Sequence, residues 1–378
     1  METQIPLPSE YTHAETPELL NRITARKKQL GAKLCVLGHH YQRDEVIQFA
    51  DFTGDSLELS QLAAGQSGAE FIVFCGVHFM AESADILSST DQKVILPNLH
   101  AGCAMADMAD VEDVAAAMEE VSALTGARVI PVSYVNSTAD IKALTARAGG
   151  ACCTSSNVRN VFEWALRPAA DGGAGAGKVF CIPDQHLARN TAIAMSRGED
   201  ECRLYDPLLP NGGLTIEDID RATFILWKGH CYVHQFFRPE HVADVRKAHP
   251  DISVIVHPEC PREVVELADA SGSTSQIITA IEAAEPGSKW AIGTESNLVN
   301  RLAKRHKDKF ICVLNQASAT CTQMCRIDLP HLLWALDAIA SGQIVNRITV
   351  PLETAADARA ALQRMIDIKA VTQITKHS

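Results

Sequence analysis

A cysteine ends each of three strand-like stretches, KVILPNLHAGC (93–103), ATFILWKGHC (222–231) and FICVLNQASATC (310–321). Each stretch contains a short apolar run of the kind found in parallel strands that are buried on both faces. Equivalent loop ends of a repeated fold would bring three thiolates to a common centre. Three protein ligands leave one metal position open for water or substrate, whereas four close a structural zinc site or an iron–sulfur cluster.

These stretches are the fourth members of a pattern of four strand-like runs that occurs three times. The first three runs of each unit are LCVLGHHY (34–41), ADFTGDS (50–56) and EFIVFCGVH (70–78), then RVIPVSYVN (128–136), AGGACCTSSN (148–157) and KVFCIPDQH (178–186), then ISVIVHPE (252–259), ADASGSTS (268–275) and KWAIGTES (289–296). The pattern predicts internal repetition of an α/β unit. The alternative is the generic strand–loop–helix rhythm that all α/β proteins share.

The length of 378 residues exceeds the size at which one hydrophobic core usually keeps growing. The repeat predicts three α/β domains with parallel sheets and flanking helices. We expect domain 1 at 1–106, domain 2 at 107–240 and domain 3 at 241–325. The C-terminal part, 326–378, is expected to pack back on domain 1 as scaffold.

Charge and cysteine usage narrow the function classes. The chain has 34 basic and 46 acidic side chains, a net charge of −12, and no cluster of Lys and Arg, so neither nucleic acid nor a membrane is an expected partner. The segment METQIPLPSEYTH lacks the features of a signal peptide, which favours a cytoplasmic protein with reduced cysteines. Thiols inside apolar runs are expected to be structural: Cys35, Cys75, Cys181 and Cys312.

Polar residues end the first run of every unit. They are His39, Tyr41, Tyr134, Asn136, His257 and Glu259. Ligands of parallel sheets collect at the carboxyl ends of strands, and a partly buried Glu259 is a candidate general base. The alternative is that these side chains are ordinary polar caps on loops.

Ser or Thr stands in the second run of every unit, just before a helical stretch. The residues are Ser56, Ser155, Ser156, Ser273 and Thr274. The N–H groups at helix starts attract carboxylate or phosphate, although ordinary N-capping explains each residue equally well. Cys231 with His234, and Cys321 with Cys325, have spacings that also suit half of a zinc site.

The ordered motifs of the chain resemble the quinolinate synthase family from about residue 30 to 335. The motifs are GHHYQ (38–42), DFTGDSLELS (51–60), AGCAMADM (101–108), SYVNS (133–137), CTSSN (153–157), PDQHLARNTA (183–192), WKGHCYVH (227–234), HPEC (257–260), GSTS (272–275) and CTQM (321–324). The resemblance implies three domains in a pseudo-threefold arrangement around a central [4Fe–4S] cluster, held by Cys103, Cys231 and Cys321. The Cys-x-x-Met pattern favours Cys321 over Cys325.

The resemblance also implies the reaction, which belongs to NAD biosynthesis. Iminoaspartate and dihydroxyacetone phosphate condense to quinolinate with release of phosphate and two waters, and L-aspartate oxidase is a transient partner. The catalytic residues implied are His39, Tyr41, Tyr134 and Glu259. Those implied in substrate binding are His39, Ser56, Tyr134, Asn136, Ser155, His234, His257, Glu259, Ser273 and Thr274. Another [4Fe–4S] hydro-lyase, or a non-catalytic iron–sulfur or zinc sensor, is the alternative.

Overall fold

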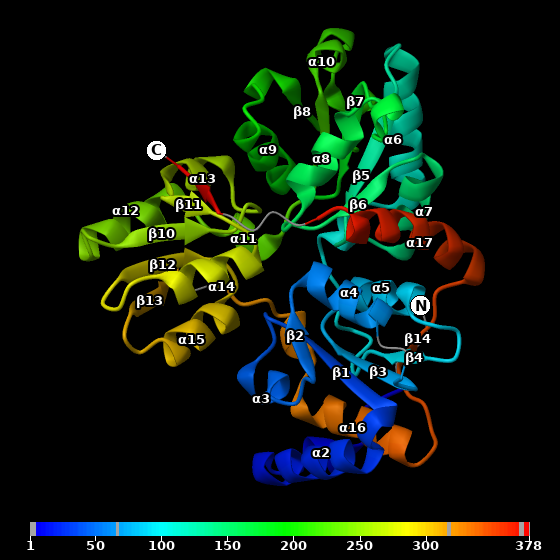
Figure 1. The fold of residues 1–378 in the computed structure, drawn as a ribbon, viewed down its shortest axis with the longest axis vertical. Coiled ribbons are helices and arrows are strands. Elements are labelled where there is room, and N and C mark those ends of the chain that lie inside the picture. The colour runs from blue at the N-terminus through cyan, green and yellow to red at the C-terminus, as the bar shows by residue number, and fades with distance from the viewer. Residues whose placement is uncertain (1–4, 66–67, 316–318, 370–373, 378) are drawn as a thin grey trace. The chain divides into compact units, whose positions relative to one another are not determined.

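The computed structural model describes residues 5–65, 68–315, 319–369 and 374–377. They form three five-stranded sheets with flanking helices (Figure 1). Every strand pair is parallel except two at sheet edges. The α/β class with three parallel sheets is therefore confirmed.

The first sheet has the strand order β14-β4-β3-β1-β2. Its strands are β1 (Leu34–His39), β2 (Phe52–Gly54), β3 (Phe71–Cys75), β4 (Lys93–Ile95) and the antiparallel β14 (Arg347–Ile348). All residues of β1 and β3 are buried, as expected for strands covered on both faces. Taken from the β2 edge, the strands that correspond to the four runs of the repeat lie side by side in the order second, first, third and fourth.

The other two sheets repeat this order. The second sheet is β6-β5-β7-β9-β8, with β5 (Val129–Tyr134), β6 (Ala151–Cys153), β7 (Lys178–Ile182), β8 (Cys202–Tyr205) and β9 (Phe224–Trp227). The third is β13-β12-β10-β11-β15, with β10 (Ser253–Val256), β11 (Ala270–Ser271), β12 (Lys289–Gly293), β13 (Phe310–Val313) and the antiparallel β15 (Thr375–Lys376). Each sheet adds one strand to the four of the repeat. A shared strand order is what internal repetition requires.

The chain divides into two compact units. The first comprises Met1–Cys103 and Cys321–Leu352 and holds the first sheet, and the second comprises Ala104–Thr320 and Glu353–Ser378 and holds the other two. The C-terminal part thus divides at Leu352. The boundaries of the three predicted domains stay predictions.

Helices of the first unit flank its sheet and pack on one another. They are α1 (Ser9–Thr12), α2 (Thr16–Leu30), α3 (Asp44–Ile47), α4 (Ser56–Gly65), α5 (His78–Leu87) and α16 (Leu329–Ala340). In Figure 1, α16 runs beside α2. Asp337 of α16 binds both α2 and α1, because it accepts hydrogen bonds from Arg22 of α2 at 2.9 Å and from Tyr11 of α1 at 3.2 Å.

Helices of the second unit connect the strands of both its sheets. They are α6 (Val111–Leu124), α7 (Ala139–Arg147), α8 (Val158–Leu166), α9 (Gln185–Ala194), α10 (Ile216–Arg221), α11 (Tyr232–Gln235), α12 (Pro239–Ala248), α13 (Arg262–Leu267), α14 (Thr274–Ala283), α15 (Ser296–Arg305) and α17 (Leu352–Asp367). The last helix is anchored by Asn157, whose side-chain amide donates to the carbonyl of Met365 at 2.9 Å.

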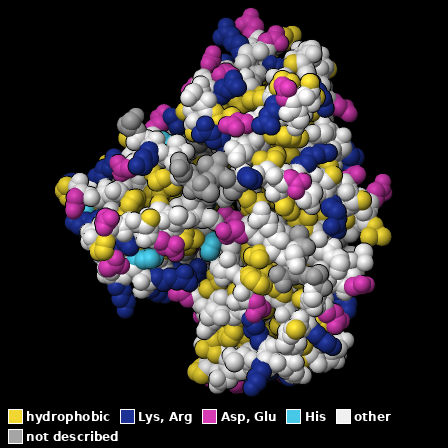
Figure 2. All heavy atoms as spheres, in the orientation of Figure 1, with side chains coloured by type: hydrophobic (Ala, Val, Ile, Leu, Met, Phe, Trp, Pro, Cys, Tyr) yellow, Lys and Arg dark blue, Asp and Glu magenta, His cyan; other side chains and the backbone are white. Residues whose placement is uncertain are grey.

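The surface mixes charges of both signs. On the face drawn in Figure 2, Lys and Arg side chains are interspersed with Asp and Glu. Among the described residues, no helix combines the length and the apolar character that a membrane crossing requires.

Candidate functional site

The first strand of each repeat ends at two polar residues whose positions differ by two: His39 and Tyr41, Tyr134 and Asn136, and His257 and Glu259. His39 is the last residue of β1, Tyr134 is the last of β5, and His257 follows β10 directly. The local geometry also repeats. The amide of Tyr41 donates to Nδ1 of His39 at 3.1 Å, and the amide of Glu259 donates to Nδ1 of His257 at 3.3 Å. The repeat therefore sets functional residues at matching positions.

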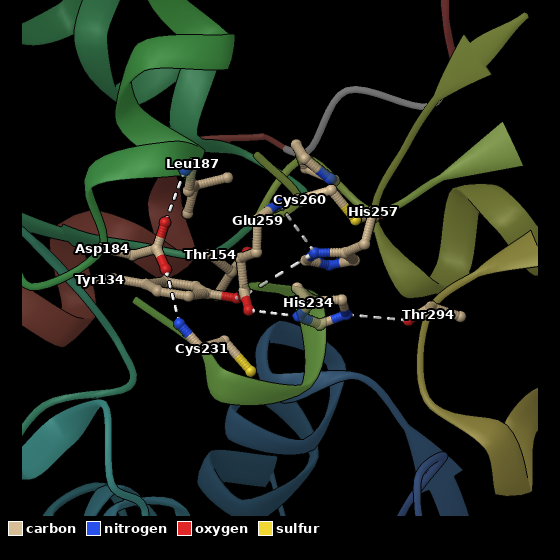
Figure 3. A network of polar contacts seen from close by, with 12 residues as sticks. Tyr134, Thr154, Asp184, Leu187, Cys231, His234, His257, Glu259, Cys260 and Thr294 are labelled. Atoms are coloured by element: carbon tan, nitrogen blue, oxygen red, sulfur yellow. Dashed lines mark hydrogen bonds and ion pairs between the residues drawn. The ribbon is translucent and has the colours of Figure 1, made fainter. Parts of the chain in front are cut away.

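In the second unit these strand ends meet in one buried network. Glu259 lies between Tyr134 and His234 (Figure 3). The Tyr134 hydroxyl donates to Glu259 Oε1 at 2.5 Å, and Glu259 Oε2 lies 2.7 Å from His234 Nδ1. The other ring nitrogen of His234 is 3.1 Å from the hydroxyl of Thr294. These side chains come from β5, α11 and the loops after β10 and β12, so the network joins two sheets.

Burial and charge set the protonation of the network. Burial lowers the pKa of His257 to about 3, which keeps this imidazole neutral. Burial alone would raise the pKa of Glu259, but His234 and the hydrogen bonds from His234 and Tyr134 outweigh it and hold the pKa at about 2. His257 stacks on His234 with ring centroids 4.5 Å apart and an angle of 17° between the planes. Glu259 is thus a buried carboxylate held between donors.

Cys231 is placed beside this network by the start of α11. It is the N-cap residue of that helix, and His234 follows three positions later, so the two side chains lie on one helix face. Its amide donates to Asp184 Oδ2 at 3.2 Å, while Asp184 Oδ1 accepts from the amide of Leu187 at 2.6 Å. Burial and the charge of Glu259 raise the pKa of Asp184, and hydrogen bonds from backbone amides oppose them.

The cysteines fall into two groups that bear on an iron–sulfur cofactor. Burial raises the thiol pKa of eight of them, Cys35, Cys75, Cys152, Cys153, Cys181, Cys202, Cys260 and Cys312. Metal ligands must be thiolates, so these eight are poor ligands. The other four are Cys103, Cys231, Cys321 and Cys325, which are partly exposed, as is Cys312 of the first group. They include the three predicted ligands, so the donor set fits a cluster held by three cysteines.

Cys231, His234 and Glu259 could also bind a metal ion by themselves. One donor atom from each lies within 4.8 Å of the others. His234 and Glu259 are buried, at 2% and 3% exposure, whereas Cys231 is partly open to solvent. The three offer sulfur, nitrogen and oxygen, a mixture that zinc accepts.

The predicted Ser and Thr residues have different local roles. Ser273 caps α14, since its hydroxyl accepts from the amide of Gln276, so the N-capping alternative holds for it. Ser56 begins α4, but the cap is Asp55, which accepts from two amides of the first turn. Thr274 is the buried first residue of α14. Their binding of carboxylate or phosphate stays a prediction.

A small cavity with both polar and apolar lining lies where these turns of the second unit meet. It has a volume of about 210 Å3, and Ser155 is among the residues that line it. The neighbouring Ser156 donates to the hydroxyl of Ser273 at 3.0 Å and so links the two sheets.

The side-chain oxygen of Asn136 is buried and, within the described part of the chain, has no hydrogen-bond partner. Asn136 is thus suited to accept a bond from a ligand.

The predicted residues are divided between the two units. Tyr134, His234, His257, Glu259 and Cys231 are neighbours within the second unit. The remaining predicted residues of the first unit are His39, Tyr41, Ser56, Cys103 and Cys321.

Sequence reasoning missed Asp184 and Thr294 as members of the site. Asp184 follows β7 and Thr294 follows β12, so both stand after the third strand of a repeat. The runs KVFCIPDQH and KWAIGTES carried this signal, because third strands end at the same edge as first strands.

Comparisons with known proteins identify the family of this chain. The model of the family described as "Quinolinate synthetase A protein" matches residues 21–367. A quinolinate synthase of Streptomyces coelicolor is 53% identical over 97% of this chain and 92% of its own length. One of Geobacillus thermodenitrificans is 52% identical over 95% and 96%, and one of Bacillus pumilus is 48% identical over 96% of each. The chain therefore belongs to the quinolinate synthetase A family.

Proposed function

We propose that this chain condenses iminoaspartate with dihydroxyacetone phosphate to quinolinate, releasing phosphate and two waters, in the cytoplasm. The observation that carries the proposal is the buried network of Tyr134, Glu259 and His234 beside Cys231. Condensation followed by loss of two waters requires repeated proton transfers, and such a network supplies both donors and an acceptor. The names of the relatives support the same product.

A [4Fe–4S] cluster would be held by Cys103, Cys231 and Cys321. The three are partly exposed, whereas seven of the eight cysteines whose thiol pKa burial raises are buried. When bound, the cluster would supply Lewis-acid assistance to dehydration without net electron transfer. The amide of Cys231 is tied to Asp184 at 3.2 Å, which orients the loop that carries this ligand.

Tyr134, Glu259 and His234 are the groups that would transfer or direct protons. Glu259 is fully engaged, with Tyr134 on one oxygen and His234 on the other. A reactant that takes the place of either donor leaves a buried carboxylate with less stabilisation, and the carboxylate then becomes a stronger base. Thr294 holds the outer nitrogen of His234 and keeps the ring oriented. We assign catalysis to Tyr134 and Glu259 together with His39 and Tyr41, and His234 orients Glu259.

Anionic groups of the substrates would be bound by the repeated turns. Ser155 lines the small cavity of the second unit, and Asn136 has a buried oxygen available to a ligand. His257 is neutral and can donate or accept without adding charge. We assign substrate binding also to His39, Tyr41, Ser56, Ser273 and Thr274, whose positions follow the repeat.

The test is quinolinate formation by the anaerobically purified protein. Cluster-replete enzyme is mixed with dihydroxyacetone phosphate and freshly generated iminoaspartate, and the product is measured by liquid chromatography with mass spectrometry. Cys103→Ser should lose the brown colour, the bound iron and the activity. Cys325→Ser is the matched control for Cys321→Ser and should keep all three.

Two outcomes would reject parts of the proposal. A cluster-replete protein that forms no quinolinate would favour another hydro-lyase or a sensor. Full iron content in Cys103→Ser would refute the ligand assignment. Because iminoaspartate is an unstable imine, we also propose that it is received by transient contact with L-aspartate oxidase, which added oxidase should reveal as a faster product rate.

A further inference from the structure

We propose that Cys231, His234 and Glu259 form a second kind of metal site, for a single Zn2+-like divalent cation, in protein that lacks its cluster. The evidence for this cation site is the geometry of residues in the second unit alone. Its consequence, competition with the cluster, rests on the proposed function. Cation and cluster would exclude one another because both need the sulfur of Cys231.

The spacing of the donor atoms suits such a cation. They lie within 4.8 Å of one another before any metal binds. Zinc bonds of about 2.0–2.3 Å in a tetrahedral site place donor atoms roughly 3.3–3.8 Å apart. A separation of 4.8 Å therefore has to shorten by about 1.0–1.5 Å, which side-chain rotation of the partly exposed Cys231 can provide, and the 2.7 Å between His234 Nδ1 and Glu259 Oε2 has to lengthen. Three protein donors would leave the fourth position to water.

The surrounding groups already orient the two buried ligands. Tyr134 holds Glu259 Oε1, which leaves Oε2 for the cation. Thr294 holds His234 Nε2, which leaves Nδ1 for the cation. These two remaining atoms are 2.7 Å apart, and the cation would replace the hydrogen bond between them. Outer partners of this kind fix ring orientation in natural zinc sites.

Charge balance favours the cation. A thiolate and a carboxylate carry two negative charges, which one divalent cation neutralises in a place where burial penalises net charge. The proton of the Cys231 thiol leaves to solvent on binding, and the ring proton of His234 moves to Nε2, where the Thr294 oxygen accepts it. No oxidation or reduction takes place.

The test is a cobalt titration of the cluster-free full chain under anaerobic conditions. Co2+ reports the ligands, since a cysteine ligand gives a thiolate-to-cobalt charge-transfer band and a tetrahedral site gives intense visible bands. We expect one Co2+ per chain, displaced by one Zn2+. Cys231→Ser should abolish the charge-transfer band, and His234→Gln and Glu259→Gln should each weaken binding at least tenfold.

Cys103→Ser is the matched control. It should keep the cobalt spectrum, because the proposed cation site lies within the second unit, yet fail to assemble the cluster. Far-ultraviolet circular dichroism checks that every variant is folded. A charge-transfer band that survives Cys231→Ser, or that Cys103→Ser removes, would overturn the inference. Cluster assembly in Cys103→Ser would instead refute the ligand set of the proposed function and leave the cobalt result standing.

Discussion

Tyr134→Phe tests whether the network at Glu259 holds the second unit together. The substitution removes one hydroxyl that donates to Glu259 at 2.5 Å, with both side chains buried, at 6% and 3% exposure. A hydrogen bond to a charged group contributes about 1.5–3 kcal/mol, and a neutral one about 0.5–1.5 kcal/mol. We therefore expect the free energy of unfolding of the cluster-free chain to fall by about 2 kcal/mol.

A double-mutant cycle isolates the charge. Gln at position 259 keeps the shape and an oxygen acceptor but removes the charge, so Tyr134→Phe should cost about 1 kcal/mol less in the Glu259→Gln background. Urea unfolding, followed by fluorescence of the buried Trp227 and by circular dichroism, measures both differences. The matched control is Tyr205→Phe, whose hydroxyl bonds an exposed Glu120 at 2.5 Å and which should cost less than Tyr134→Phe. Equal costs in both backgrounds would refute a charge-assisted bond between Tyr134 and Glu259.

Two further predictions concern packing and pH. Gly150→Ala would place a Cβ 1.9 Å from the carbonyl oxygen of Pro131, so stability should fall by about 1–3 kcal/mol or more, whereas Gly126→Ala meets no atom within 4 Å. Thermal unfolding compares the two, and equal melting temperatures would contradict the close approach. Burial and then Asp337 raise the pKa of Tyr11 from 10.0 to about 12, so the stability that its neutral phenol contributes is complete below pH 10.0 and lost as pH rises through about 12. Wild type should lose more stability across that range than Tyr11→Phe, and parallel curves would contradict the shift.

The family and the strand pattern were readable from sequence because both are local. Apolar runs of strand length predicted β1, β3, β5 and β7, and the thiols inside them proved buried, as Cys75 and Cys181 show. The polar pairs at strand ends were also predicted, since a parallel strand exposes its carboxyl end to ligands. The repeat of residue types along the chain was sufficient to predict both the strands and the polar residues at their ends.

Other features depended on partners far apart in the chain. Tyr134 and Glu259 are 125 residues apart, and Ser156 and Ser273 are 117 apart. Ser273 and Ser155 look alike in sequence, yet one caps a helix and the other lines a cavity.

The sequence by itself determined the α/β class, the three repeated strand sets and the residue types at their ends, because apolar periodicity and turn composition are properties of neighbouring residues. Only the tertiary structure decided that Glu259 sits between Tyr134 and His234 and that Asp184 holds the amide of Cys231. Strand order and the docking of one sheet on another select those partners. Such choices follow from the burial of whole surfaces, which no short stretch of sequence encodes.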